Sequence, residues 1–166
     1  MNEKQQALID AFFVECSEED QKLYIQIINL FDRLGYRPKK TKSQTFGLDF
    51  QHPTLKETIA KFYPHDFRLK FYASHIYSEK FNNSILTVIE EFEGKYTGCY
   101  ECGRCQDELA GYTYRYPDGK VVFRCGRELN TIADLTIDDL PEILRLIENQ
   151  HTYFITQAKK KAESAF

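Results

Sequence analysis

The residues with the clearest chemical potential in this chain are four cysteines. Cys99, Cys102 and Cys105 stand within seven positions, and Cys125 follows after a short intervening segment. Two thiolates separated by two residues can bind one metal ion, and Gly103 relieves the tight turn that such binding requires. The spacing predicts a tetrahedral zinc site whose ligands are Cys99, Cys102, Cys105 and Cys125.

A β-hairpin is expected to carry the fourth thiol back to the other three. Residues 112–116 and 120–124 are short β-rich runs, and Pro117-Asp118-Gly119 between them has the residues of a type I turn with a glycine bulge. This turn sets the strand register. The expected cross-strand pairs are Tyr116 with Lys120, Tyr114 with Val122, Tyr112 with Arg124, and Gly111 with Cys125.

Three other interpretations of the cysteine pattern remain open. Three cysteines at this spacing with a distant fourth are also typical of an iron–sulfur cluster, although Gly126 stands where ferredoxins have proline. His151 is an alternative fourth zinc ligand if Cys105 points away. A thiol–disulfide redox pair of Cys99 and Cys102 is less favoured, because such a pair normally begins a helix and has no third thiol nearby.

Four thiolates indicate a structural metal ion, because they leave no coordination position for water or substrate. The chain also contains no nucleotide-binding loop, catalytic triad or acid pair that would indicate an enzyme. The expected function is therefore that of a metal-stabilised binding or regulatory protein. The alternatives are an iron–sulfur redox protein and a homodimeric scaffold that associates through its last helix.

The hairpin also suggests a ligand-binding face. In the expected register, one face carries Tyr112, Tyr114, Tyr116 and Arg124, and the other carries Val121, Phe123 and Cys125. We expect the second face to contact the core, which would leave tyrosines and a basic residue free to stack on bases or to bind an anion. The interpretation preferred to ligand binding is that the tyrosines pack under a helix with their hydroxyl groups at the rim.

Composition limits the size and the partners of the protein. A chain of 166 residues with 42% hydrophobic and 14% aromatic residues suits one domain, or one domain with a small appended module. A net charge of −3 and a pI near 5.8 disfavour a dedicated nucleic-acid-binding protein without excluding a local basic patch. The partner is otherwise unknown, and a homodimer is possible.

The compartment is inferred from the amino terminus and from the cysteines. The first ten residues have neither a basic leader nor an apolar run, and no later window approaches the length of a membrane span. A cytoplasmic protein without membrane contact is expected. In a reducing compartment five cysteines favour metal binding over disulfides, and the odd one, Cys16, is expected to be a free thiol in the core.

The first half of the chain predicts a helix followed by strands. Ser17 and Asp20 form a capping pattern before an apolar stripe that ends at Gly35. The basic segment 33–42 is expected to be a solvated helix end and loop. Alternating apolar residues predict strands at 45–50 and 67–73, with the ambiguous run 55–63 between turns that contain His52 and His65.

The second half predicts two helices around the hairpin. One begins near Ser78 or Asn82, presents Phe81, Ile85, Ile89 and Phe92 toward the sheet, and stops at Gly94. The other is long, with Thr136 or Asp139 as its cap and Pro141 in its first turn. Lys159, Lys160 and Lys161 are expected to form its solvated end.

These elements predict an α+β fold. An antiparallel three-stranded meander is flanked by helices, and a metal-stapled β-hairpin and a long C-terminal helix follow. The expected division is a core of residues 1–95, a cysteine and hairpin module of residues 96–130, and a C-terminal helix in residues 131–166 that packs on the core. Together they would form one compact domain.

The motifs of the cysteine module also resemble those of a known group of proteins. The run from Tyr96 to Cys105, the Tyr116-Pro-Asp-Gly119 turn and Phe123-Arg-Cys125-Gly126 are similar to a family of small bacterial cytosolic proteins of uncharacterised activity. Residues 17–93 resemble small α+β domains in the order of their elements. The resemblance implies a cysteine-rich knuckle and a hairpin, and no activity.

Overall fold

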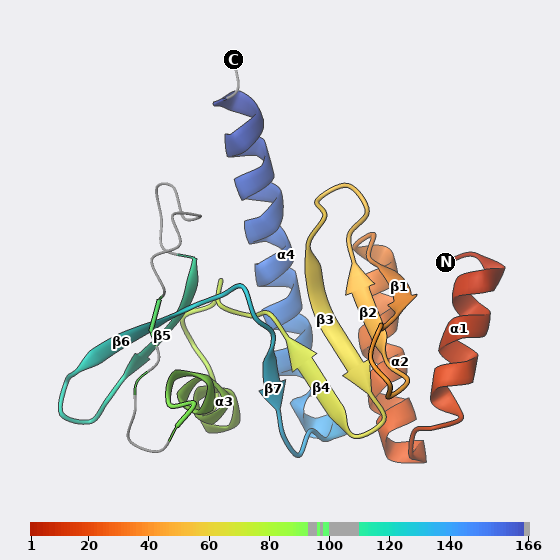
Figure 1. Ribbon diagram of the computed structural model, residues 1–166, viewed down its shortest axis with the longest axis horizontal. Helices are drawn as coiled ribbons and strands as arrows, with labels where there is room; N and C mark the ends of the chain where they lie inside the picture. The colour runs from red at the N-terminus through yellow and green to blue at the C-terminus, as the bar shows by residue number, and fades with distance from the viewer. Residues whose placement is uncertain (93–95, 97, 100–109, 165–166) are drawn as a thin grey trace.

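The computed structural model describes residues 1–92, 96, 98–99 and 110–164. Within these residues the chain forms a five-stranded antiparallel sheet, a separate two-stranded sheet and four α-helices, which confirms the predicted α+β class (Figure 1). The elements in chain order are α1 (Glu3–Phe13), α2 (Glu18–Arg33), β1 (Arg37–Lys40), β2 (Leu48–Gln51), β3 (Thr58–Tyr63), β4 (Asp66–Leu69), α3 (Glu79–Ile89), β5 (Gly111–Arg115), β6 (Val121–Cys125), β7 (Asn130–Ile132), a 3-10 turn (Ile137–Asp139) and α4 (Leu140–Glu163).

The large sheet contains the predicted meander. Its strand order is β1-β2-β3-β4-β7, and all neighbouring strands are antiparallel. The predicted strands 45–50 and 67–73 are observed as the shorter β2 and β4, and β3 occupies part of the ambiguous run 55–63. The meander is therefore confirmed as β2-β3-β4, and β1 and β7 extend it at its two edges.

Strand β1 corrects the prediction of a loop in the basic segment 33–42. Arg37–Lys40 pairs antiparallel with β2 and forms an edge of the sheet. Lys39 and Lys40 are exposed, and Pro38 is buried. Exposed lysines and proline are common on edge strands because they prevent pairing with another chain. The same residues remove the apolar alternation by which a strand is recognised from sequence.

The sequence pattern did not predict helix α1, because only two of its residues, Ile9 and Phe12, are buried and they leave no clear apolar stripe. Its first turn is closed by a capping box, in which the Asn2 side chain accepts from the Gln5 backbone N–H and the Gln5 side chain accepts from the Asn2 N–H. The amino group of Met1 lies 3.0 Å from Oδ1 of Asp32, which anchors the start of the chain to α2.

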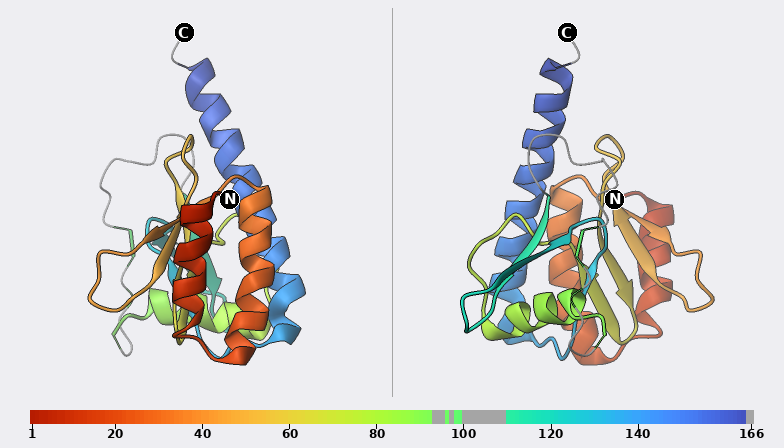
Figure 2. Two further views of the ribbon diagram at one scale, coloured as in Figure 1. Left: turned by 90° about the vertical axis from the view of Figure 1, so that its right-hand side faces the viewer. Right: turned by 60° about the vertical axis from the view of Figure 1, so that its left-hand side comes forward.

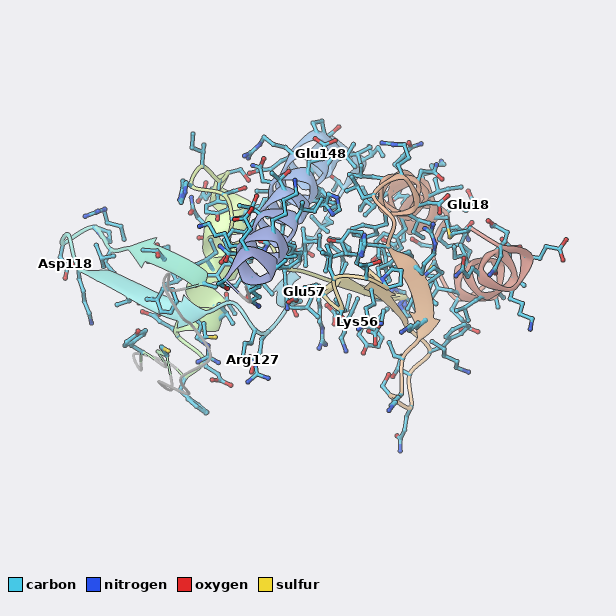
Figure 3. The ribbon with its side chains drawn as sticks, turned by 90° about the horizontal axis from the view of Figure 1, so that it is seen from above. Glu18, Lys56, Glu57, Asp118, Arg127 and Glu148 are labelled. Atoms are coloured by element: carbon cyan, nitrogen blue, oxygen red, sulfur yellow. The ribbon has the colours of Figure 1, made fainter. Side chains whose placement is uncertain are left out.

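Helix α2 begins as predicted, because the Ser17 side chain accepts from the Asp20 backbone N–H. It ends before Gly35, whose φ of 88° is the left-handed conformation that favours glycine. Figure 3, which looks along α4 from above, shows α2 and α4 side by side on one face of the sheet. The core between the helices and the sheet is largely aromatic, with Phe50 and Phe67 at 5.2 and 4.8 Å from the ring of Phe62.

Helix α3 supports the hairpin. Ser78 is its N-cap as predicted, and Phe81, Ile85 and Ile89 are fully buried. Phe92 was expected on the same stripe, but it follows the end of the helix and is 62% exposed. The apolar stripe contacts β7, β5 and β6, so α3 covers the sheet edge and the hairpin more than the meander (Figure 2).

Helix α4 has the predicted start and length. Thr136 and Asp139 form a capping box at the 3-10 turn. Pro141 lies in the first turn of α4, where proline is tolerated because a backbone N–H there would have no acceptor within the helix. Its C-terminal end extends beyond the sheet in Figure 1. In the described part of the chain, no helix combines the length and apolar character needed to span a bilayer.

Candidate metal centre

The hairpin has the predicted register. The pairs Gly111 with Cys125, Tyr112 with Arg124 and Tyr114 with Val122 are all observed. At the turn, the Tyr116 N–H donates to the Lys120 carbonyl at 2.8 Å, and Gly119 has a φ of 88°. The turn residues therefore fix which residue of β6 lies beside the start of β5, and that residue is Cys125.

The start of β5 approaches Cys125 very closely. The Gly126 N–H donates to the Ala110 carbonyl at 2.9 Å. A Cβ atom on Gly111 would lie 2.1 Å from the Arg124 carbonyl oxygen, so only glycine fits at this point of the strand. The chain that leaves the cysteine segment is therefore held against the backbone on both sides of Cys125.

The beginning of the cysteine segment contacts the same strand. The Tyr96 hydroxyl donates to the Phe123 carbonyl, and it also lies 3.4 Å from the Phe123 N–H. Tyr96 is three residues before Cys99, and Phe123 is two residues before Cys125. Both ends of the segment that carries Cys99, Cys102 and Cys105 therefore contact the last residues of β6.

The complete ligand set is not described. Cys99 and Cys125 are both half-buried, whereas Cys102 and Cys105 lie outside the described residues. Within residues 1–92, 96, 98–99 and 110–164, no three histidine, cysteine, aspartate or glutamate side chains come together as a metal site would require. The four-cysteine site stays a prediction.

Cys16 is separate from this region, as predicted. Its side chain is 9% exposed, and its Sγ atom lies 3.5 Å from the Phe12 carbonyl oxygen. Burial, with smaller effects from the charges of Asp20 and Glu15, raises the pKa of the Cys16 thiol to about 12. Because metals bind the thiolate, this thiol is a poor ligand and behaves as a small core side chain.

The two faces of the hairpin are reversed relative to the prediction. Val121 was expected in the core but is 49% exposed, whereas Tyr112 on the opposite face is 1% exposed. The Tyr112 hydroxyl accepts from the Phe71 N–H at 3.3 Å and lies 3.4 Å from the Leu69 carbonyl, to which it can donate. Tyr112 therefore packs inward, in agreement with the interpretation that the tyrosines lie under a helix, and it joins the hairpin to the segment after β4.

The other side chains on the tyrosine face also contact neighbouring side chains. Arg124 is 4% exposed, and its guanidinium lies 3.4 Å from Glu91 and 3.6 Å from Glu128. Tyr114 and Tyr116 pack edge to face with ring centroids 5.0 Å apart. The Tyr116 hydroxyl donates to the Glu90 carboxylate, which raises the pKa of that hydroxyl to about 12. Tyr114, Tyr116 and Arg124 therefore each contact another side chain of the protein, and the binding of a ligand to this face stays a prediction.

His151 lies in a different cluster from the hairpin. Its Nδ1 is 3.3 Å from the hydroxyl of the buried Tyr36, and its ring centroid lies 6.0 Å from that of His52. His52 was expected to be solvated, but it is half-buried, and its Nδ1 accepts from the Leu55 N–H at 3.2 Å. The structure thus places His151 beside the rings of Tyr36 and His52, next to β1 and β2.

A groove that the sequence analysis missed runs along α4. It has a volume of about 540 Å³ and lies between α4 and residues 73–76. Its α4 residues recur at intervals of three or four, which is the only signal in the sequence that could have revealed it. The lining residues are Ala73, Ser74, His75, Ile76, Arg145, Asn149, Thr152, Tyr153, Thr156, Gln157 and Lys160.

Comparison with known proteins gave no relative: no family model, no curated protein and no solved structure matches the chain. The resemblance suggested by the motifs of residues 96–126 therefore stays a prediction. The function has to be inferred from the residues and geometry of this chain.

Proposed function

We propose that this protein is a non-catalytic binding protein whose hairpin module is closed by a structural zinc ion. The ligands are Cys99, Cys102, Cys105 and Cys125. The observation that supports the proposal most strongly is that both ends of the cysteine segment contact the end of β6. A segment tethered at both ends beside Cys125 has its three thiols within a short chain length of the fourth.

The donor set suits zinc and a structural role. Zinc prefers four ligands in a tetrahedron, and thiolate sulfur is among its commonest ligands in small structural sites. Four thiolates occupy every position and leave none for a reacting water. When bound, the ion would join the segment before β5 to the end of β6, and its binding free energy would stabilise the hairpin module.

The local packing shows why the module would need such a bond. The hairpin contributes Tyr112, Val122 and Arg124 to the buried side that faces α3, while Val121 on its outer side is exposed. A two-stranded hairpin is only marginally stable without a further partner. A metal ion bound at the end of the hairpin opposite its turn would join the two strands, and this bond would compensate for the small apolar area that the outer face of the hairpin buries.

The test is metal analysis of the purified protein. The expected content is one zinc per chain, which is lost when Cys99, Cys102, Cys105 or Cys125 is replaced by serine. Cys16→Ser is the matched control, because Cys16 is a buried thiol of the same chain and should leave the zinc content unchanged. A Cys125→Ser protein that keeps its full zinc would refute the closure of the hairpin through this residue.

The same preparation tests the iron–sulfur alternative. A protein isolated with iron and inorganic sulfide, and therefore brown, would replace zinc with a cluster on the same cysteines. A colourless protein with zinc supports the structural site. Removal of zinc by a chelator should then lower the thermal midpoint, since a metal that binds only the folded chain stabilises it.

A further inference from the structure

The wall of the groove opposite α4 is hydrogen-bonded to that helix. Residues 73–76 follow β4, and three side chains of α4 hold them in place: the Ala73 N–H donates to Gln150 Oε1 at 3.0 Å, Asn149 Nδ2 donates to Ser74 Oγ at 2.9 Å, and Arg145 donates to the Ile76 carbonyl at 3.0 Å. Figures 1 and 2 show this segment beside α4. These three hydrogen bonds join the two walls of the groove to each other.

The charges that line the groove are basic. Arg145 and Lys160 lie among its lining residues together with His75, and none of the lining residues carries a carboxylate. Arg145 is partly neutralised by Glu142, whose Oε1 lies 3.2 Å away. Lys160 has no carboxylate within ion-pair distance in the described part of the chain. A chain with a net charge of −3 thus presents a basic groove, which favours an anionic ligand.

The length of the groove indicates the shape of that ligand. Arg145 and Lys160 are separated by fifteen positions on α4, which corresponds to about 22 Å along the helix axis. A single small anion cannot reach both cations. An extended peptide of about six residues has the required length.

The middle of the groove can bind a peptide backbone. The Thr152 hydroxyl donates to the Glu148 carbonyl and the Thr156 hydroxyl donates to the Thr152 carbonyl, both at 2.9 Å. Each oxygen retains lone pairs that can accept from a peptide N–H. The Gln157 amide can both donate and accept, and Ile76, which is 78% exposed, offers an apolar contact at the rim.

We infer that this groove binds an extended acidic peptide, with its carboxylates on Arg145 and Lys160 and its backbone along the threonines. The inference rests on the proposed role as a binding protein, but it does not depend on the zinc ion. It places the binding surface on α4 and residues 73–76, where Tyr153 of the groove contacts Tyr72, whose ring also contacts Tyr112 of the hairpin.

The test is fluorescence anisotropy with a labelled hexaglutamate peptide at low salt. Binding to the wild-type protein should weaken as salt is added. Lys160→Glu should weaken binding by about tenfold, because it reverses a charge that contacts the peptide. Lys161→Glu is the matched control: it makes the same change of net charge at the next residue, outside the groove, and should weaken binding by less than about twofold.

A second variant tests the middle of the groove. Gln157→Glu is nearly isosteric and adds a carboxylate, so it should weaken binding while leaving the thermal midpoint unchanged. Equal weakening by Lys160→Glu and Lys161→Glu would overturn the inference, since it would show attraction to net charge alone. Absence of binding to the wild type, or complete competition by inorganic phosphate, would overturn it as well.

The zinc content of each sample separates the two proposals. A wild-type protein that binds the peptide but contains no zinc would refute the metal site and leave the groove standing. A protein that contains zinc but does not bind the peptide would do the reverse.

Discussion

Tyr112→Phe tests whether the hairpin is attached to the sheet through one buried hydroxyl. The substitution keeps the ring, which packs 5.2 Å from Phe71 and 5.6 Å from Tyr72, and removes only the oxygen. The buried N–H of Phe71 then loses the acceptor that lies 3.3 Å away. Leaving a buried donor without a partner costs about 1–3 kcal/mol, and we expect a loss of unfolding free energy in this range.

Tyr112→Ala should cause the largest loss of unfolding free energy among these variants. It removes the whole side chain, which is 1% exposed, and truncation of a buried aromatic residue typically costs about 3–5 kcal/mol. The control is Tyr63→Phe, which removes a hydroxyl from a half-buried ring that packs against Arg68 and should change stability by less than about 0.5 kcal/mol.

The assay is urea denaturation followed by far-ultraviolet circular dichroism, because the chain contains no tryptophan to report by fluorescence. The midpoint should fall in the order Tyr63→Phe, Tyr112→Phe, Tyr112→Ala, with an unchanged slope for each two-state transition. If Tyr112→Phe were as stable as Tyr63→Phe, the hydroxyl would contribute nothing, and the attachment would rest on ring packing alone.

Two further predictions concern pH and the hairpin turn. Burial, together with Arg37 for His52 and with His52 for His151, lowers the pKa of both histidines. A lowered pKa means that the unfolded chain binds more protons, so their contribution to stability should be complete above about pH 6.5 and decline as the pH falls further. Thermal melts across this range should show the decline, and His151→Gln should flatten it. Gly119→Val should cost about 1 kcal/mol, because a φ of 88° disfavours a branched side chain although the space around it is open. Gly119→Asn should cost less, and a neutral Gly119→Val in urea denaturation would contradict the role assigned to the turn.

The register of the hairpin could be predicted because it depends on adjacent residues. Pro117, Asp118 and Gly119 specify the turn, and the turn specifies every pair up to Gly111 with Cys125. The cap of α2 was found for the same reason, since Ser17 directly precedes that helix, and α3 begins after Ser78, one of the two starts that the sequence allowed. Patterns of this kind need no knowledge of the rest of the fold.

The missed elements have weak local patterns. Helix α1 buries two residues, and β1 presents lysines at the sheet edge. Their positions are set by long-range contacts, such as the Met1 amino group with Asp32 and the backbone pairs of β1 with β2. Neither contact leaves a periodic signal in the residues that make it.

The sequence by itself determined the strands of the hairpin, its turn and the residue that faces Gly111, because turn geometry is encoded within a few residues. Which face of the hairpin is buried was decided only by the tertiary structure. Both faces are apolar enough for a core, Tyr112 and Val122 on one and Val121 and Phe123 on the other. The face with Tyr112 is buried because Phe71 and the apolar stripe of α3 provide the rings and backbone groups that a buried tyrosine needs. Phe71 and α3 lie far from the hairpin in the sequence, so no local pattern reports their contact with it.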